Sequence, residues 1–218
     1  MPRLVTFGCS NTYGHGLYDC CDQHLGAGPH PSNYAWPQLL ADKLNYECVN
    51  LSQPGSGNYQ ILITLLKTQL NPDDLVILAF SYFIRYNFYV MSDKLGNGKT
   101  LQLPERKSWM TSNHFQNKVI ETFDDEYWEE KNYWDNWLTI QHCELYLNSL
   151  NINNFSFLNL PNGALETKPD LIKLNNFWDD IKLIVKDTGL DGKHPGMSSH
   201  KNQANKIYEK LGKTSIAI

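Results

Sequence analysis

The sequence predicts an α/β fold, a three-layer α/β/α sandwich around a mostly parallel, doubly wound (flavodoxin-like) sheet. First, short apolar runs alternate with amphipathic segments along the 218 residues, an order that right-handed crossovers convert into a parallel sheet with helices on both faces. Second, residues 75–80 are entirely apolar, as in a central strand covered on both sides. Third, Ser10, Gly55 and Ser81 each follow a predicted strand, at the edge where such sheets bind ligands.

The first half of the chain predicts two strand–helix units. The apolar run at 5–8 enters a turn-rich segment, which is typical of a buried strand that ends in a loop. Residues 33–44 carry apolar side chains at helical spacing and form the first predicted helix. Residues 46–51 predict a short strand, and residues 58–70 an amphipathic helix, so the unit repeats.

The second half begins with the strand at 75–80 and is less regular. Residues 92–107 contain glycine, proline and asparagine and predict an irregular loop. Residues 112–151 predict mainly helix with a break near 124–125, and residues 155–160 a fourth strand. The helix at 198–211 places its apolar residues on one face and closes the fold.

We expect residues 1–218 to form a single domain, because a chain of this length can bury a hydrophobic core that is stable without disulfides or structural metals. A helical, aromatic-rich insertion is expected at about 92–150. The tryptophans and tyrosines of 126–137 recur at helical spacing, which is more typical of a core than of a binding surface. Their density leaves open an exposed patch that forms a lid or a contact in a homo-oligomer or larger assembly.

Composition excludes several classes of protein. The net charge is −4 and no block of five like charges occurs, so a nucleic-acid partner is not expected. No apolar run approaches the roughly 20 residues of a membrane span. The start of the chain lacks the pattern of a secretory signal, and we expect a cytoplasmic or virion-associated protein.

The five cysteines are odd in number and form no C-x-x-C motif, which argues against a disulfide framework and a ribbon-type zinc site. Cys20, Cys21, His24 and His30, with His15 nearby, could meet around a metal. Loops often carry such residues by chance, so we predict no metal and no organic cofactor.

Candidate chemistry lies near the two ends of the chain. Ser10 follows the first strand, and a serine becomes a nucleophile when a histidine takes its proton and a carboxylate orients that histidine. Asp191 stands three residues before His194, so one turn can place the carboxylate beside Nδ1. In the structural alternative Ser10 caps a helix or lies in a turn, and Asp191 and His194 cap the last helix and close a turn before it.

The segments 7–14 (Phe-Gly-Cys-Ser-Asn-Thr-Tyr-Gly) and 191–195 (Asp-Gly-Lys-His-Pro) resemble the first and last blocks of the SGNH/GDSL hydrolases. Residues 50–58 (Asn-Leu-Ser-Gln-Pro-Gly-Ser-Gly-Asn) resemble their second block. The resemblance implies a triad of Ser10, His194 and Asp191. It also implies an oxyanion hole of the Ser10 and Gly55 N–H groups, with Asn58 as a candidate substrate-binding residue.

The sequence departs from that family at two places. Cys9 replaces the aspartate before the nucleophile, and the Gly-x-Asn-Asp expected after the third strand is replaced by residues 78–85 (Leu-Ala-Phe-Ser-Tyr-Phe-Ile-Arg). A divergent branch of similar proteins has Ser or Thr followed by an arginine here. That similarity makes Ser81 a candidate third oxyanion donor and Arg85 a candidate substrate-binding residue.

The resemblance therefore implies a serine esterase that forms an acyl-enzyme, with a carbohydrate O-acetyl group as a candidate substrate. The alternative is a catalytically weak or inactive binding or structural protein with the same fold, such as a virion or surface component.

Overall fold

The computed structural model describes residues 1–21, 26–83, 86–90, 99–103, 125–160 and 167–213. Its strands are β1 (Arg3–Gly8), β2 (Glu47–Asn50), β3 (Leu75–Phe80), β4 (Tyr86–Val90), β5 (Lys99–Leu103) and β6 (Asn153–Leu158). Its helices are α1 (Ser10–Tyr13), α2 (Trp36–Leu44), α3 (Asn58–Lys67), α5 (Asp125–Ser149) and α6 (Met197–Lys213). The four strands predicted for the sheet and three of the predicted helices are present, with their ends displaced by up to three residues.

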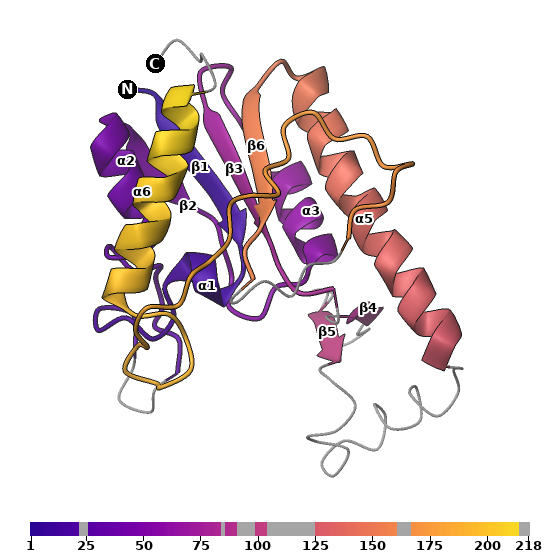
Figure 1. Ribbon diagram of the computed structural model, residues 1–218, viewed down its shortest axis with the longest axis horizontal. Coiled ribbons are helices and arrows are strands. Elements are labelled where there is room, and N and C mark those ends of the chain that lie inside the picture. Colours follow the sequence, from indigo (N-terminus) through magenta and orange to yellow (C-terminus); the bar gives the residue numbers. More distant parts are fainter. Residues whose placement is uncertain (22–25, 84–85, 91–98, 104–124, 161–166, 214–218) are drawn as a thin grey trace.

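Four of the strands form one sheet in the order β2-β1-β3-β6, and every neighbouring pair is parallel (Figure 1). β3 is buried along its whole length, as expected for a central strand. Beyond β6, the N–H of Trp178 donates to the carbonyl of Ser156 (2.7 Å), and the N–H of Ser156 donates to the carbonyl of Asn176 (2.9 Å). Residues 176–178 therefore extend the sheet past β6.

Helices cover both faces of this sheet: α2 and α6 lie on one side, and α3 and α5 on the other (Figure 1). Because successive side chains of a strand point to opposite faces, β3 contributes to both hydrophobic cores. Val76, Leu78 and Phe80 pack with α3 and α5, whereas Leu75, Ile77 and Ala79 pack with α2 and α6. The predicted three-layer α/β/α sandwich with a parallel sheet is confirmed.

The segment at about 92–150 is not wholly helical, and the expectation of a loop across 92–107 is wrong for part of its length. β5 lies within that range and pairs with β4 as an antiparallel hairpin. The rest of 92–107, like 112–124, lies outside the described residues. The assignment of 1–218 to one domain remains a prediction.

The aromatic side chains described within 126–137 belong mainly to the core. Trp137 is fully buried, and its ring meets Phe83 edge to face at 5.2 Å. Tyr133 and Trp134 are partly buried against the same core. Packing therefore accounts for this part of the pattern, and a homo-oligomer contact remains a prediction.

Candidate active site

The end of β1 presents Ser10 at the edge of the sheet. Gly8 is required there, because a Cβ would collide with the side chain of Thr12 and lie 3.0 Å from the carbonyl oxygen of Ala79. Cys9 caps α1 from an extended conformation, and its carbonyl accepts the N–H groups of Thr12 and Tyr13 (3.0 and 2.9 Å). Ser10 is thus the first residue of a short helix and is 5% exposed.

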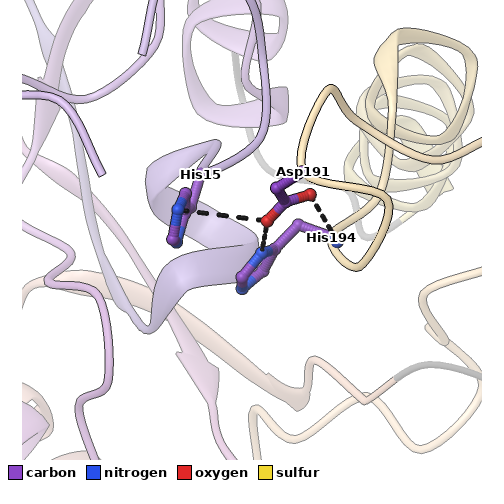
Figure 2. A group of neighbouring side chains, drawn as sticks. All are labelled: His15, Asp191 and His194. Atoms are coloured by element: carbon purple, nitrogen blue, oxygen red, sulfur yellow. Dashed lines mark hydrogen bonds and ion pairs between the residues drawn. The ribbon is translucent and has the colours of Figure 1, made fainter. Parts of the chain in front are cut away.

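The C-terminal loop brings Asp191 and His194 together. Nδ1 of His194 lies 2.5 Å from Oδ2 of Asp191, while Oδ1 accepts the N–H groups of Lys193 (3.0 Å) and His194 (3.1 Å), as Figure 2 shows for His194. A carboxylate only accepts hydrogen bonds, so this contact selects the imidazole tautomer that carries its proton on Nδ1. The lone pair then lies on Nε2, the position that a general base requires.

These hydrogen bonds keep Asp191 ionised. Burial of the carboxylate acts to raise its pKa, but the hydrogen bond from the His194 side chain and those from the N–H groups of His194 and Lys193 outweigh it. Together they lower the pKa of Asp191 to about 2. The loop therefore holds a permanent negative charge beside His194 at neutral pH.

A different aspartate caps the last helix. The carboxylate of Asp187 accepts the N–H groups of Ser198 (2.9 Å) and Ser199 (2.8 Å) at the start of α6. Asp191 is not needed for that role, and its contacts are with His194 and its neighbours. The helix-capping alternative for Asp191 is therefore wrong.

The loop that carries Asp191 lies against the segment that follows α1. Gly16 has a φ of 93°, and a Cβ there would lie 2.9 Å from Oδ1 of Asp191 and 3.2 Å from Cβ of His194. The N–H of Leu190 donates to the carbonyl of Gly16 (2.7 Å). A Cβ on Gly189 would lie 2.5 Å from that same carbonyl oxygen. Close backbone packing between glycines thus joins the two ends of the chain beside α1.

This packing also brings in His15, a residue that sequence reasoning did not place here. The imidazole rings of His15 and His194 are stacked, with centroids 4.2 Å apart and planes inclined by 28°. Nε2 of His15 lies 3.9 Å from Oδ2 of Asp191 (Figure 2). No spacing in the sequence indicates this contact. It depends on the close packing of Gly16 against Gly189, two residues that are far apart in the chain.

The segment that contains Gly55, the expected oxyanion donor, lies beside the end of β1. The N–H of Gln53 donates to the carbonyl of Gly8 (3.1 Å), and Nδ2 of Asn50 donates to the carbonyl of Thr12 in α1 (3.0 Å). Gly55 has a φ of 82° and therefore occupies the left-handed region that favours glycine. Within the described residues, no acceptor is present for the N–H of Gly55 or for that of Ser10.

Asn58 and Ser81 have structural partners. Oδ1 of Asn58 accepts the N–H of Ser81 (2.7 Å), and Nδ2 donates to the carbonyl of Ser81 (3.2 Å) and to Oδ1 of Asn136 (2.7 Å). Asn58 and Ser81 are fully buried. Asn58 therefore ties α3 to the end of β3 and to α5, and the Ser81 N–H is engaged. Arg85 lies outside the described residues.

The residues that could bind a metal are not the set that the sequence suggested. Within the described part of the chain, the group that could hold an ion is His15, Asp191 and His194, whose ligand atoms lie within 4.8 Å of one another. Cys20 and Cys21 are free thiols outside this group, as are the other three cysteines. His24 is not among the described residues.

No family profile and no curated protein matches this chain. Among solved structures, a carbohydrate esterase whose active site displays divergent catalytic and non-catalytic binding functions aligns with a TM-score of 0.60 at 15% identity, over 98% of this chain and 69% of that one. An acetyl xylan esterase from Butyrivibrio proteoclasticus aligns with a TM-score of 0.57 at 16% identity, over 97% of this chain and 64% of its own. The chain thus spans less than two thirds of the acetyl xylan esterase.

A member of the lipolytic G-D-S-L protein family from Veillonella parvula aligns with a TM-score of 0.48 at 11% identity, over 98% of this chain and all (100%) of that one. The alignments with the carbohydrate esterase and the acetyl xylan esterase show that the protein shares their α/β/α fold. This is the SGNH/GDSL-type fold that the sequence motifs resemble. None of the helices in the described ranges has the length and apolarity needed to span a membrane.

Proposed function

We propose that this protein is a serine esterase in which Ser10 is the nucleophile, His194 the general base and acid, and Asp191 the carboxylate that orients His194. The observation that carries the proposal is the 2.5 Å contact between Asp191 and His194, held by glycine packing against the segment that directly follows Ser10 and α1. That segment remains linked to Ser10, since the N–H groups of Gly14 and His15 donate to the Ser10 carbonyl (3.0 and 3.1 Å).

The proposed reaction has two halves. Oγ of Ser10 forms a bond to the ester carbonyl carbon while His194 takes its proton; the oxyanion then collapses, the bond to the alcohol oxygen breaks, and His194 returns the proton to the leaving alcohol. In the second half His194 takes a proton from water, the resulting hydroxide attacks the acyl-enzyme, and Ser10 leaves with that proton. The fixed charge of Asp191 stabilises the imidazolium formed in each half.

The N–H groups of Ser10 and Gly55 are the proposed oxyanion donors. Both belong to segments that meet at the end of β1, and neither has an acceptor within the described residues. Ser81 is left out of the proposed oxyanion hole, because its N–H already donates to Asn58 and its hydroxyl, which has no partner within the described residues, is fully buried. Two backbone donors would stabilise the oxyanion less than three do, by about 2.7–4 kcal/mol for one missing donor.

We propose an acetylated carbohydrate as the substrate, because structures of the same fold are named as a carbohydrate esterase and an acetyl xylan esterase. One observation favours the non-catalytic alternative. Since the Ser81 N–H is engaged and the Ser81 hydroxyl is fully buried, the third block offers no exposed donor at this position. A protein that binds its ligand without turning it over would tolerate that loss.

Covalent labelling by a fluorophosphonate probe tests the proposed nucleophile. We expect the wild-type chain to be labelled and Ser10→Ala to be unlabelled, with Ser149→Ala, an exposed serine on α5, as the matched control that keeps its label. A folded wild-type protein that takes no label would reject the esterase and favour the binding protein. Release of acetate from acetylated xylo-oligosaccharides would then test the substrate class.

A further inference from the structure

His15 gives the proposed catalytic loop a third ligand atom. Asp191 and His194 alone would offer a metal ion two ligands, but the ring of His15 lies on that of His194 with its Nε2 directed at the same carboxylate oxygen (Figure 2). Two imidazoles and a carboxylate, with a fourth position left for water, form a ligand set that Zn²⁺ prefers. The three side chains are between 6% and 22% exposed, so an ion can reach them from solvent.

We propose that His15, Asp191 and His194 form a site for one zinc-like divalent ion, and that the bound ion switches off the esterase. The inhibitory part of this proposal rests on the proposed function, whereas the binding part does not. His15 is the residue that distinguishes this site from an ordinary Asp–His pair.

The distances lie near those that a tetrahedral ion requires. Zinc bonds of about 2.0–2.1 Å place neighbouring ligand atoms about 3.3 Å apart. Nε2 of His15 lies 3.9 Å from Oδ2 of Asp191, and Nδ1 of His194 lies 2.5 Å from the same oxygen. The first distance has to shorten and the second to lengthen, each by less than about 1 Å. The remaining pair, the ligand nitrogens of His15 and His194, lies within 4.8 Å.

Metal binding and catalysis are mutually exclusive here. If the ion bonds to Nδ1 of His194, the proton that this nitrogen donates to Asp191 has to leave it and transfers through solvent to Nε2. The neutral ring then carries its single proton on Nε2. His194 can no longer accept the proton of Ser10, and Asp191 no longer orients it. Because the ion joins residues from both ends of the chain, it also stabilises the folded state.

Calorimetric titration of the metal-free full-length chain with zinc chloride tests the site. We expect one zinc ion per wild-type chain. His15→Phe keeps an aromatic ring over His194 and removes the ligand nitrogen, so it should weaken binding by at least the roughly 10–100-fold that loss of an outer-shell partner costs. His30→Ala removes an exposed histidine outside the group and should bind as the wild type does. Wild-type affinity in His15→Phe, or the absence of stoichiometric binding, would overturn the site.

Fluorophosphonate labelling with and without zinc tests the inhibition. Zinc should slow labelling of the wild type in proportion to the fraction of zinc sites that are occupied. The labelling rate of His15→Phe should be the same with and without zinc. Labelling of the zinc-saturated wild type at its metal-free rate would overturn the inhibitory role. A wild type that is unlabelled even without zinc would refute the esterase, while the titration would still decide whether the metal site exists.

Discussion

Lowering the pH from 7 to 5 is expected to destabilise this protein through one buried side chain, His200. This residue of α6 is fully buried, and its Nδ1 accepts the N–H of Trp36, the first residue of α2, at 3.1 Å. Burial lowers the pKa of His200 to about 4, and the nearby Asp187 carboxylate only partly offsets that effect. His200 therefore stays neutral in the fold at pH values where an exposed histidine is charged.

The sign and size of the effect follow from proton linkage. Between pH 6.5 and about 4 the unfolded chain binds the His200 proton and the folded chain does not, so the stabilisation is present above pH 6.5 and is lost as the pH falls through this window. A difference of about 2.5 pKa units corresponds to about 3 kcal/mol in full, of which about 2 kcal/mol is lost between pH 7 and pH 5. The pKa of Asp191 is lowered from 3.8 to about 2, so its contribution is lost only at lower pH.

Urea unfolding at pH 7 and pH 5 measures this loss. His200→Asn keeps an oxygen that can accept the Trp36 N–H but does not titrate, so its free energy of unfolding should fall by about 2 kcal/mol less between the two pH values than that of the wild type. The smaller side chain lowers stability equally at both. His142→Asn, at an exposed position of α5, serves as the control and should keep the wild-type dependence. The same pH dependence in His200→Asn and wild type would refute the reasoning.

Three further substitutions test the site. Gly16→Ala should abolish most fluorophosphonate labelling, because the added Cβ would lie 2.9 Å from Oδ1 of Asp191. Gly192 also has a positive φ (67°), but a Cβ there would meet no atom within 4 Å. Gly192→Ala should therefore lose about 1–2 kcal/mol of stability and keep its labelling. Equal labelling losses in the two variants would contradict the importance of this contact. Asp191→Asn should slow labelling on the order of 10⁴-fold, and wild-type rates would exclude its orienting role. Asn58→Leu should lower the free energy of unfolding by about 2–4 kcal/mol, because it leaves the buried N–H of Ser81 unpaired; unchanged stability with a raised KM would instead indicate substrate binding.

The sheet was predictable because its strands are buried on both faces and therefore appear as short apolar runs between amphipathic segments. β5 was not, because Lys-Thr-Leu-Gln-Leu alternates over only five residues and follows a stretch rich in glycine and asparagine. The four residues of α1 are too few to show helical periodicity. That helix forms because the carbonyl of Cys9 accepts two N–H groups and Gly14, with a φ of 85°, ends it.

In the candidate site, local pairs were easier to predict than distant ones. Asp191 and His194 are three residues apart, so a single turn brings them into contact and their spacing was informative. His15 is far from both in sequence, and its position depends on a backbone approach between Gly16 and Gly189 that no periodicity records. Asn58 illustrates the same limit, since its amide is occupied by Ser81 and Asn136 from two other elements.

The Asn58–Ser81 hydrogen bond leads to a last prediction, on leaving groups. Recruiting the Ser81 N–H during the reaction would leave the fully buried Oδ1 of Asn58 without this donor, which costs about 1–3 kcal/mol. A third oxyanion donor contributes about 2.7–4 kcal/mol, so this cost cancels between about a quarter and all of the gain, and the reaction should rely mainly on Ser10 and Gly55. An enzyme with a weaker oxyanion hole depends more on the leaving group. We therefore expect kcat/KM to fall steeply from aryl acetates to alkyl acetates of similar size, and comparable values for the two series would indicate a third donor that the Ser81 segment does not supply.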